Sequence, residues 1–326
     1  MDFKAIFSKR LKNARIMRNL SVSELSARIN VPENQIIEYE NGKRFPDSKI
    51  HTALSKVFGL PLEYFFRPFT LQISGLEFKK DTSLLENETE KILLCAYEKL
   101  ERYTAVENIL EIKPKELQKI FVRDDSDVIN SALELRKNWN LGLDGIVNVV
   151  EMIENNGIKI IEVETEKSID GMSGKTPGGS FMLLNKGFLP EKKRFTALHE
   201  LGHILLDFDD RADSERLCDL FASEMLVPSK VFKQVFFASK SGLRNIQKQF
   251  GVSVNVLIDK AEYLGLLSEN DKRKFENVEE ESLFRDEKSE RFMLLVCRAY
   301  EKELISLSRG AELLNMPCAD FRKIAE

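Results

Sequence analysis

The sequence contains few cysteines and no long uncharged apolar run. No apolar run approaches the roughly 18 residues that a membrane helix needs, and the N-terminus lacks the apolar centre of a signal peptide. We therefore expect a cytoplasmic protein without a membrane partner. Four widely spread cysteines with no CxxC pair argue against a disulfide framework and against a cysteine-built zinc site. We expect them to be buried small hydrophobic residues: Cys95, Cys218, Cys297 and Cys318.

The length of 326 residues exceeds one ordinary domain and predicts two or three. With 43% hydrophobic and 31% charged residues, the chain has enough apolar material for real cores, which excludes a disordered or fibrous protein. Charge is unevenly distributed. Residues 1–70 carry twelve Lys and Arg against seven Asp and Glu, a balance of +5, and residues 71–326 carry −9. A basic head on an acidic body indicates that the head contacts a polyanion.

Apolar spacing and capping signals divide the head into short helices. Ser21 followed by Glu24 is a capping box at a helix start, and Asn41-Gly42 is a signal for a helix end. Two short helices joined by a tight turn, with flanking helices for a core, form a helix-turn-helix. The predicted helices cover residues 3–18, 21–29, 32–39 and 48–58, and a short fifth helix follows Pro61.

The motif residues between Leu20 and Pro46, which end in an E-x-G-x-x-x-P pattern, resemble the XRE/Cro-repressor family, and the resemblance covers about 60 residues of the head. The resemblance implies that the helix over residues 32–39 reads DNA, with polar side chains toward bases and basic side chains toward phosphates. Val22 departs from the family, which commonly has a DNA-contacting Gln there. A helix-turn-helix used for protein contact therefore stays open as the alternative. The expected contacts are Glu33, Asn34, Gln35 and Glu38 with bases, and Arg15, Arg18, Lys43 and Arg44 with phosphates.

The remainder of the chain predicts a mainly helical protein with a small β-sheet, an α+β organisation. Residues 83–137 have the pattern of charged helices, and residues 146–155 form another amphipathic helix. Strands are predicted over residues 157–163 and 180–185, separated by Gly-rich turns, and the pattern is helical again from Glu191 onward.

The motif His199-Glu200-x-x-His203 lies in an apolar segment that predicts a buried helix. Because residues i and i+4 share a helix face, both imidazoles can bind one metal, with Glu200 beside the metal-bound water. Imidazole is a good ligand for zinc. Zinc lowers the pKa of its water, and Glu200 would take the proton and pass it to the leaving amine. The chain has only three histidines, and two of them form this pair.

A second helix provides acidic side chains at the same spacing. A catalytic zinc needs a third protein ligand and an open water position, and Glu215 can be that ligand. Asp219, one turn further, can hydrogen-bond the far nitrogen of a ligand histidine and fix its tautomer. Two alternatives stay open: Glu215 and Asp219 belong to a solvated surface helix, or Glu224 is the third ligand.

Residues 194–228, and the chain before them back to the strand at Ile158, closely resemble the ImmA/IrrE metallopeptidase family. The resemblance implies a zincin-like domain with the activity of a zinc-dependent endopeptidase. Known members cleave a repressor, often one with its own helix-turn-helix, and so switch on stress-response or mobile-element genes. Carried over by motif position, the Zn²⁺ ligands are His199, His203 and Glu215, and the catalytic base is Glu200.

We therefore expect a transcriptional regulator that binds DNA through its head and cleaves a repressor or antitoxin-like protein with a zinc-activated water. One alternative is a non-enzymatic repressor or antitoxin whose peptidase fold only senses or dimerises, and another is self-cleavage in the connector. A homodimer is possible, since such DNA readers usually pair. The expected domains are a helix-turn-helix over 1–70, a helical connector over 71–135, a metallopeptidase over 136–235 and a helical C-terminal region over 236–326.

Two further expectations concern short segments. The strand over Ser180–Asn185 precedes the catalytic helix, and we expect it to be an edge strand that holds substrate by β-augmentation. Residues 241–266 and 305–324 have a helix, turn, helix pattern with few basic residues. Packing or partner recognition suits these two elements better than DNA reading.

Overall fold

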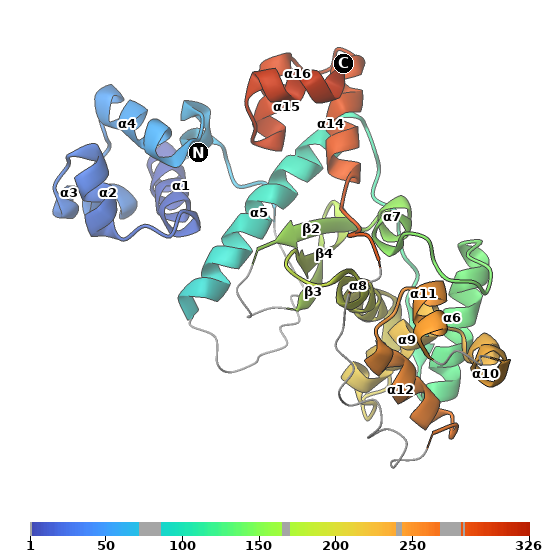
Figure 1. Cartoon of the computed structure of the whole chain (residues 1–326). Helices are drawn as coiled ribbons and strands as arrows, with labels where there is room; N and C mark the ends of the chain where they lie inside the picture. Colours follow the sequence, from blue (N-terminus) through green and yellow to red (C-terminus); the bar gives the residue numbers. More distant parts are fainter. Residues whose placement is uncertain (1, 72–85, 165–169, 239–242, 268–281, 283) are drawn as a thin grey trace. The chain divides into compact units, whose positions relative to one another are not determined.

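The computed structural model describes residues 2–71, 86–164, 170–238, 243–267, 282 and 284–326 (Figure 1). The described residues are mainly helical with two small sheets, which confirms the predicted α+β class. None of their helices is long and apolar enough to cross a membrane. The chain divides into two compact units. Unit 1 takes in Met1–Gln72, Asp81–Ile112 and Met293–Glu326, and unit 2 takes in Ile73–Lys80 and Lys113–Phe292.

Unit 1 begins with the helices predicted for the head. The backbone N–H of Glu24 donates to Ser21 Oγ at 3.1 Å and Glu24 Oε2 accepts from Ser21 N at 2.7 Å, so the capping box is confirmed. Asn30 takes the left-handed conformation in the turn, and Pro32 precedes the next helix. The elements are α1 (Phe3–Met17), α2 (Val22–Ile29), α3 (Glu33–Glu40), α4 (Ser48–Phe58) and the 3-10 helix η1 (Leu62–Phe66), around a core that includes Phe7, Leu11, Leu25, Ile36, Leu54 and Phe65.

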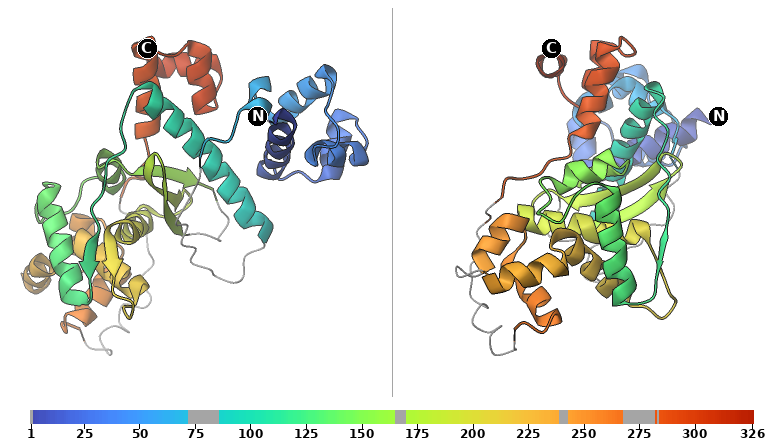
Figure 2. Two further views of the ribbon diagram at one scale, coloured as in Figure 1. Left: turned by 180° about the vertical axis from the view of Figure 1, so that it is seen from behind. Right: turned by 90° about the vertical axis from the view of Figure 1, so that its right-hand side faces the viewer.

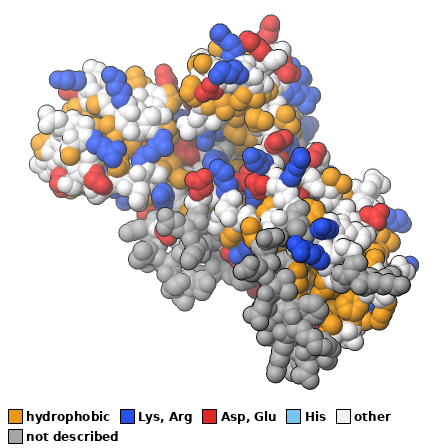
Figure 3. Space-filling view, viewed as in Figure 1, with side chains coloured by type: hydrophobic (Ala, Val, Ile, Leu, Met, Phe, Trp, Pro, Cys, Tyr) orange, Lys and Arg blue, Asp and Glu red, His pale blue; other side chains and the backbone are white. Residues whose placement is uncertain are grey.

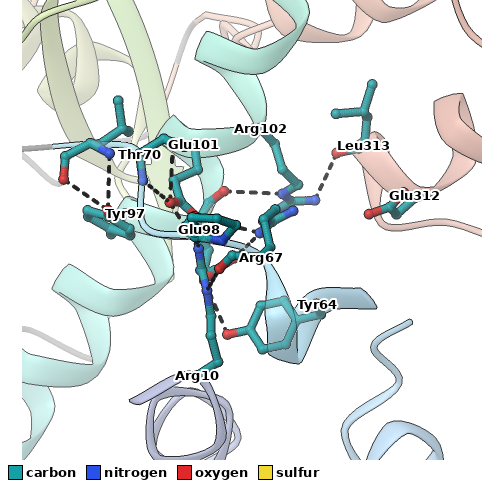
Figure 4. Close-up of polar contacts among 12 residues, drawn as sticks. Arg10, Tyr64, Arg67, Thr70, Tyr97, Glu98, Glu101, Arg102, Glu312 and Leu313 are labelled. Atoms are coloured by element: carbon teal, nitrogen blue, oxygen red, sulfur yellow. Dashed lines mark hydrogen bonds and ion pairs between the residues drawn. The ribbon is translucent and has the colours of Figure 1, made fainter. Parts of the chain in front are cut away.

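Helix α5 (Glu86–Ile109) is joined to the head by buried ion pairs (Figure 4). The fully buried Arg10 guanidinium of α1 pairs with Glu98 and, at 2.8 Å, with Glu101. Arg67 Nη2 lies 2.9 Å from Glu98 Oε2. Removing one partner of a buried pair costs about 3–5 kcal/mol, since the other charge stays buried alone. α5 is therefore an integral part of unit 1.

Three C-terminal helices complete unit 1: α14 (Arg291–Glu301), α15 (Leu307–Leu314) and α16 (Cys318–Ala325). The last two have the helix, turn, helix form predicted over residues 305–324. They pack tightly, because a Cβ atom placed on Gly310 would lie 2.2 Å from the Phe321 ring. Arg102 of α5 donates to the Leu313 carbonyl at 2.8 Å and so joins α5 to α15.

Unit 2 contains a three-stranded sheet in the order β2-β4-β3. The strands are β2 (Lys159–Val163), β3 (Gly171–Thr176) and β4 (Gly179–Asn185), with β4 parallel to β2 and antiparallel to β3. Helix α8 (Pro190–Leu205) packs against β3 and β4, and α9 (Ser214–Leu226) packs against α8 (Figure 2). The expectation that β4 is an edge strand is wrong, because it is hydrogen-bonded on both sides. The edge strand beside α8 is β3, a segment for which the glycines had predicted turns.

The other elements of unit 2 surround this centre. Residues 83–137 were expected to be helical throughout, but they include β1 (Ile120–Val122), which pairs in parallel with β5 (Leu206–Phe208). A strand paired with so distant a segment has no local signal. The remaining helices are α6 (Asp125–Asn138), α7 (Val149–Asn155), α10 (Ser229–Ala238), α11 (Leu243–Phe250) and α12 (Val254–Tyr263), the last two within the helix, turn, helix segment predicted over 241–266.

The four cysteines are free thiols, as the absence of a CxxC pair predicted. Cys218 is buried, and Cys95 and Cys297 are half-buried. The expectation of burial is wrong for Cys318, which is exposed because it begins α16 directly after the turn.

Candidate metal centre

Helix α8 presents both histidines of the motif on one face. His199 and His203 lie one turn apart, and their Nε2 atoms are 3.1 Å from each other. Glu215, in the first turn of α9, places Oε1 3.2 Å from His203 Nε2 and Oε2 3.5 Å from His199 Nε2. The structure thus brings together the three predicted ligands, with one donor atom from each within 4.8 Å of the others.

These separations fit a zinc ion. Ligand bonds of 2.0–2.2 Å in a tetrahedron separate neighbouring donor atoms by about 3.3–3.6 Å. The three distances, 3.1 Å between the imidazoles and 3.2 and 3.5 Å to the two oxygens of Glu215, lie close to this range. Two imidazoles and one carboxylate are also a donor set typical of catalytic zinc.

Asp219 lies behind His199. Its Oδ1 atom is 2.7 Å from His199 Nδ1, on the side of the ring away from Glu215 and His203. A carboxylate at this nitrogen keeps the proton on Nδ1 and leaves the Nε2 lone pair for a metal. The geometry is the one that the sequence predicted for Asp219.

Gly202, which the sequence analysis treated as an unassigned position of the motif, sets the distance between the two helices. A Cβ atom at this position would lie 2.9 Å from Cys218 Sγ and 3.4 Å from Cys218 Cα. Only glycine therefore lets α9 approach closely enough to carry Glu215 toward the histidines. A glycine inside a strongly helical pattern was the available signal.

Gly171 on β3 lies directly against Glu200. A Cβ atom there would be 2.9 Å from Glu200 Cγ, 3.0 Å from its Oε1 and 2.6 Å from Thr196 Cγ2. The edge strand and the predicted base are thus in contact through a position that has no side chain. The sequence analysis missed this role.

Two other side chains near the site have clear assignments. Lys119 donates to the carbonyls of His203 at 3.0 Å and Leu206 at 2.9 Å, and so caps the end of α8. Glu224, the alternative third ligand, lies outside the ligand group. Its carboxylate is buried against Lys260 Nζ at 2.6 Å and accepts from Ser229 N at 2.9 Å.

The predicted DNA contacts on α3 have mixed exposure. Glu33 and Asn34 are exposed, and Glu38 is half-buried. The half-buried Gln35 amide contacts the Tyr39 hydroxyl at 2.8 Å and Arg44 Nη1 at 3.1 Å. Lys43 and Arg44 are exposed after α3, and Ile37, exposed on α3 itself, was missed. Figure 3 shows Lys and Arg side chains alongside Asp and Glu side chains over the visible surface of the molecule.

Arg15 and Arg18 have partners inside the head. Arg15 forms two bonds with Glu40, at 2.6 and 2.9 Å, and Arg18 donates twice to the Phe58 carbonyl, at 3.0 and 2.6 Å. These guanidinium groups hold α1 to α3 and to the end of α4. Glu40 neutralises Arg15, whereas Arg18 is exposed and bonds only a carbonyl, and the predicted phosphate contacts stay a prediction.

Comparison with known protein families agrees with both units. Residues 8–67 match the family described as a helix-turn-helix domain, and residues 153–262 match the IrrE N-terminal-like domain. The chain thus has one segment similar to a helix-turn-helix domain and a later segment similar to an IrrE N-terminal-like domain, the two resemblances that the sequence predicted. No curated protein and no solved structure matches the chain.

Proposed function

We propose that the chain is a transcriptional regulator whose unit 2 is a zinc-dependent endopeptidase. The observation that carries the proposal is that His199 Nε2, His203 Nε2 and the Glu215 carboxylate converge within reach of one metal ion, together with Asp219 behind His199. The match of residues 153–262 to an IrrE N-terminal-like domain supports it independently.

His199, His203 and Glu215 would hold the ion. When bound, zinc supplies the positive charge that acidifies the attacking water and polarises the scissile carbonyl. Glu200, next to His199 on the same buried helix, takes the proton of that water and delivers it to the leaving amine. Gly171 of β3 leaves room for the Glu200 side chain, because a Cβ atom there would lie 2.9 Å from Glu200 Cγ.

The substrate would be an extended protein segment. β3 forms the edge of the sheet beside α8, so its outer backbone groups can pair with a substrate strand by β-augmentation. This role passes from β4, which is central, to β3. By the family resemblance, we propose a repressor or antitoxin-like protein as the substrate, and stress response as the setting.

The head would place this activity on DNA. A helix-turn-helix domain implies DNA binding, and the predicted contacts that are exposed in the structure are Arg18, Glu33, Asn34, Lys43 and Arg44. Because DNA binding requires access to the chromosome, we propose that the protein is located in the cytoplasm. We propose that the chain binds DNA as a homodimer, because helix-turn-helix domains commonly bind two half-sites as dimers.

Metal content and proteolysis test the proposal together. We expect about one zinc per chain for the wild type and for Glu200→Gln, and none for His199→Ala. Incubation with repressor and antitoxin-like proteins of the same cell should give fragments with the wild type and none with Glu200→Gln. The exposed Glu164→Gln is the control and should cleave normally. Fragments of the chain itself, absent in Glu200→Gln, would instead identify self-cleavage.

A wild-type protein that takes up no zinc when zinc is offered would refute the peptidase. The non-enzymatic repressor would then be the better description. A Glu200→Gln variant that cleaves as fast as the wild type would refute the role of Glu200 while leaving the metal site in place.

A further inference from the structure

Unit 1 contains a cavity of about 760 Å³ that the proposed function does not use. Its walls come from three parts of the unit: the head where α1 and α4 end, the middle of α5, and the turn between α15 and α16. The polar lining includes Arg18, Lys99, Arg102 and Glu312, and the apolar lining includes Met17, Leu60 and Met316.

The acidic groups of this lining are already neutralised. Glu98 is paired with Arg10 and with Arg67. Glu312 Oε2 lies 2.6 Å from Arg309 Nη1. The charge that the cavity presents is therefore set by its basic side chains.

Arg18 and Arg102 have no carboxylate within 4.0 Å among the residues that the structure describes. Arg18 donates only to the Phe58 carbonyl, and Arg102 donates to the carbonyls of Glu98, at 3.3 Å, and Leu313, at 2.8 Å. Figure 4 shows Arg102 reaching from α5 toward α15. Carbonyl groups fix the position of a guanidinium without neutralising its charge.

Burial makes this arrangement costly for Arg102. Desolvation lowers the pKa of the Arg102 guanidinium below its ordinary value, which is the opposite of what a paired arginine such as Arg10 shows. The group is still charged at neutral pH. An anion in the cavity would replace the water that Arg102 has lost.

The start of α16 adds donors to the same cavity. Pro317 and Cys318 line it, and Pro317, as the N-cap, offers neither an N–H nor a capping side chain. The first backbone N–H groups of α16 therefore lack a cap, and they carry the positive end of the helix dipole.

We propose that this cavity binds a small molecule with an oxyanion group, held by Arg18 and Arg102, and with an apolar body against Met17, Leu60 and Met316. A phosphate and a carboxylate share the chemistry that two guanidinium groups recognise. Because one wall is the helix-turn-helix head, an occupied cavity would stabilise the head, α5 and the C-terminal helices as one body. The site would be an effector site, independent of the peptidase centre.

The test uses the full-length Glu200→Gln protein, so that loss of peptidase activity cannot affect it. The probes are ATP, pyrophosphate and citrate, with adenosine as the uncharged control, measured by calorimetry at constant ionic strength. We expect at least one anion to bind with Kd below 1 mM and adenosine not to bind, the order of ATP and citrate separating a phosphate from a carboxylate ligand. If none of the three anions binds, the proposal is refuted.

Variants locate the site. Arg18→Gln and Arg102→Gln should each weaken binding by at least about tenfold, and Arg102→Lys, which keeps the charge, should weaken it less. Arg322→Gln, exposed on α16 and outside the cavity lining, is the matched control. If the control protein loses as much affinity as Arg102→Gln while both keep their thermal midpoint, binding is not at this cavity and the proposal fails.

Discussion

Glu287 joins helices α7 and α8 of unit 2 through its buried carboxylate. Its buried carboxylate accepts from Val149 N at 2.8 Å and Val150 N at 3.1 Å, at the start of α7, and it pairs with the buried Arg194 guanidinium of α8. Glu287→Ala leaves that charge buried without its partner, which costs about 3–5 kcal/mol. The two N–H groups would cost about 1 kcal/mol each if they stayed unpaired, but water can reach a loosened helix end. We expect a total loss of about 3–5 kcal/mol in the free energy of unfolding.

The assay is urea unfolding followed by tryptophan fluorescence. The chain has a single tryptophan, Trp139, which packs against the core of unit 2, so the signal reports on that unit. A chelator must be present, because a bound metal would add its own stabilisation. Glu290→Ala, an exposed neighbour, is the control and should change the midpoint little. A decrease of less than about 1 kcal/mol in the free energy of unfolding of Glu287→Ala would refute the reasoning, because leaving the Arg194 charge buried and unpaired should cost more than that.

Three more predictions follow from single contacts. Gly202→Ala forces α9 away from α8, so we expect about 1–3 kcal/mol lower stability and weaker zinc binding by equilibrium dialysis; unchanged zinc affinity would contradict the spacing argument. Asp219→Asn should lower zinc affinity about 10–100-fold, measured with a chromophoric chelator, since His199 loses its carboxylate. Burial raises the pKa of Glu154, so its protonated form favours the fold: its contribution is present below the ordinary pKa near 4.5 and is lost as pH rises through the raised value. Urea midpoints of wild type and Glu154→Gln should therefore diverge over that interval, and parallel curves would refute it.

The fold was predictable where local signals decide it. Ser21 with Glu24 fixes the start of α2 without any tertiary contact, and α4 begins at Ser48 as predicted, with Asp47 before it as the N-cap. The glycines of β3 instead predicted turns, although the segment is a strand. This strand forms because β4 pairs with it from Gly171 to Thr176, and because Gly171 fits against Glu200. Neither cause is visible in the residues themselves.

The boundaries of the units depended on long-range charge. Nothing in the pattern of α1 shows that Arg10 is buried, since an arginine on a helix is ordinarily solvated. Its pairing with Glu98 and Glu101 is a property of the packed unit. Likewise, the sequence around Glu224, an acidic residue on an apolar helix, is compatible both with a metal ligand and with a member of a buried ion pair. The packed structure decides between these roles, because Lys260 lies beside the Glu224 carboxylate.

The candidate metal ligands and the predicted DNA contacts show why residues of one kind of site are easier to bring together from sequence than those of the other. Residues i and i+4 of any helix share a face, so the helix itself brings His199 and His203 together. A second helix then has to add only one carboxylate, that of Glu215. A phosphate contact needs a cation that no internal carboxylate neutralises, and that depends on every neighbouring element. Arg15 met the pattern but is paired with Glu40, whereas Arg18 donates to the neutral Phe58 carbonyl and keeps its charge. The spacing of two histidines within one helix therefore predicts that both can bind the same metal ion. Whether an arginine is free to bind a phosphate can be decided only from the packed structure.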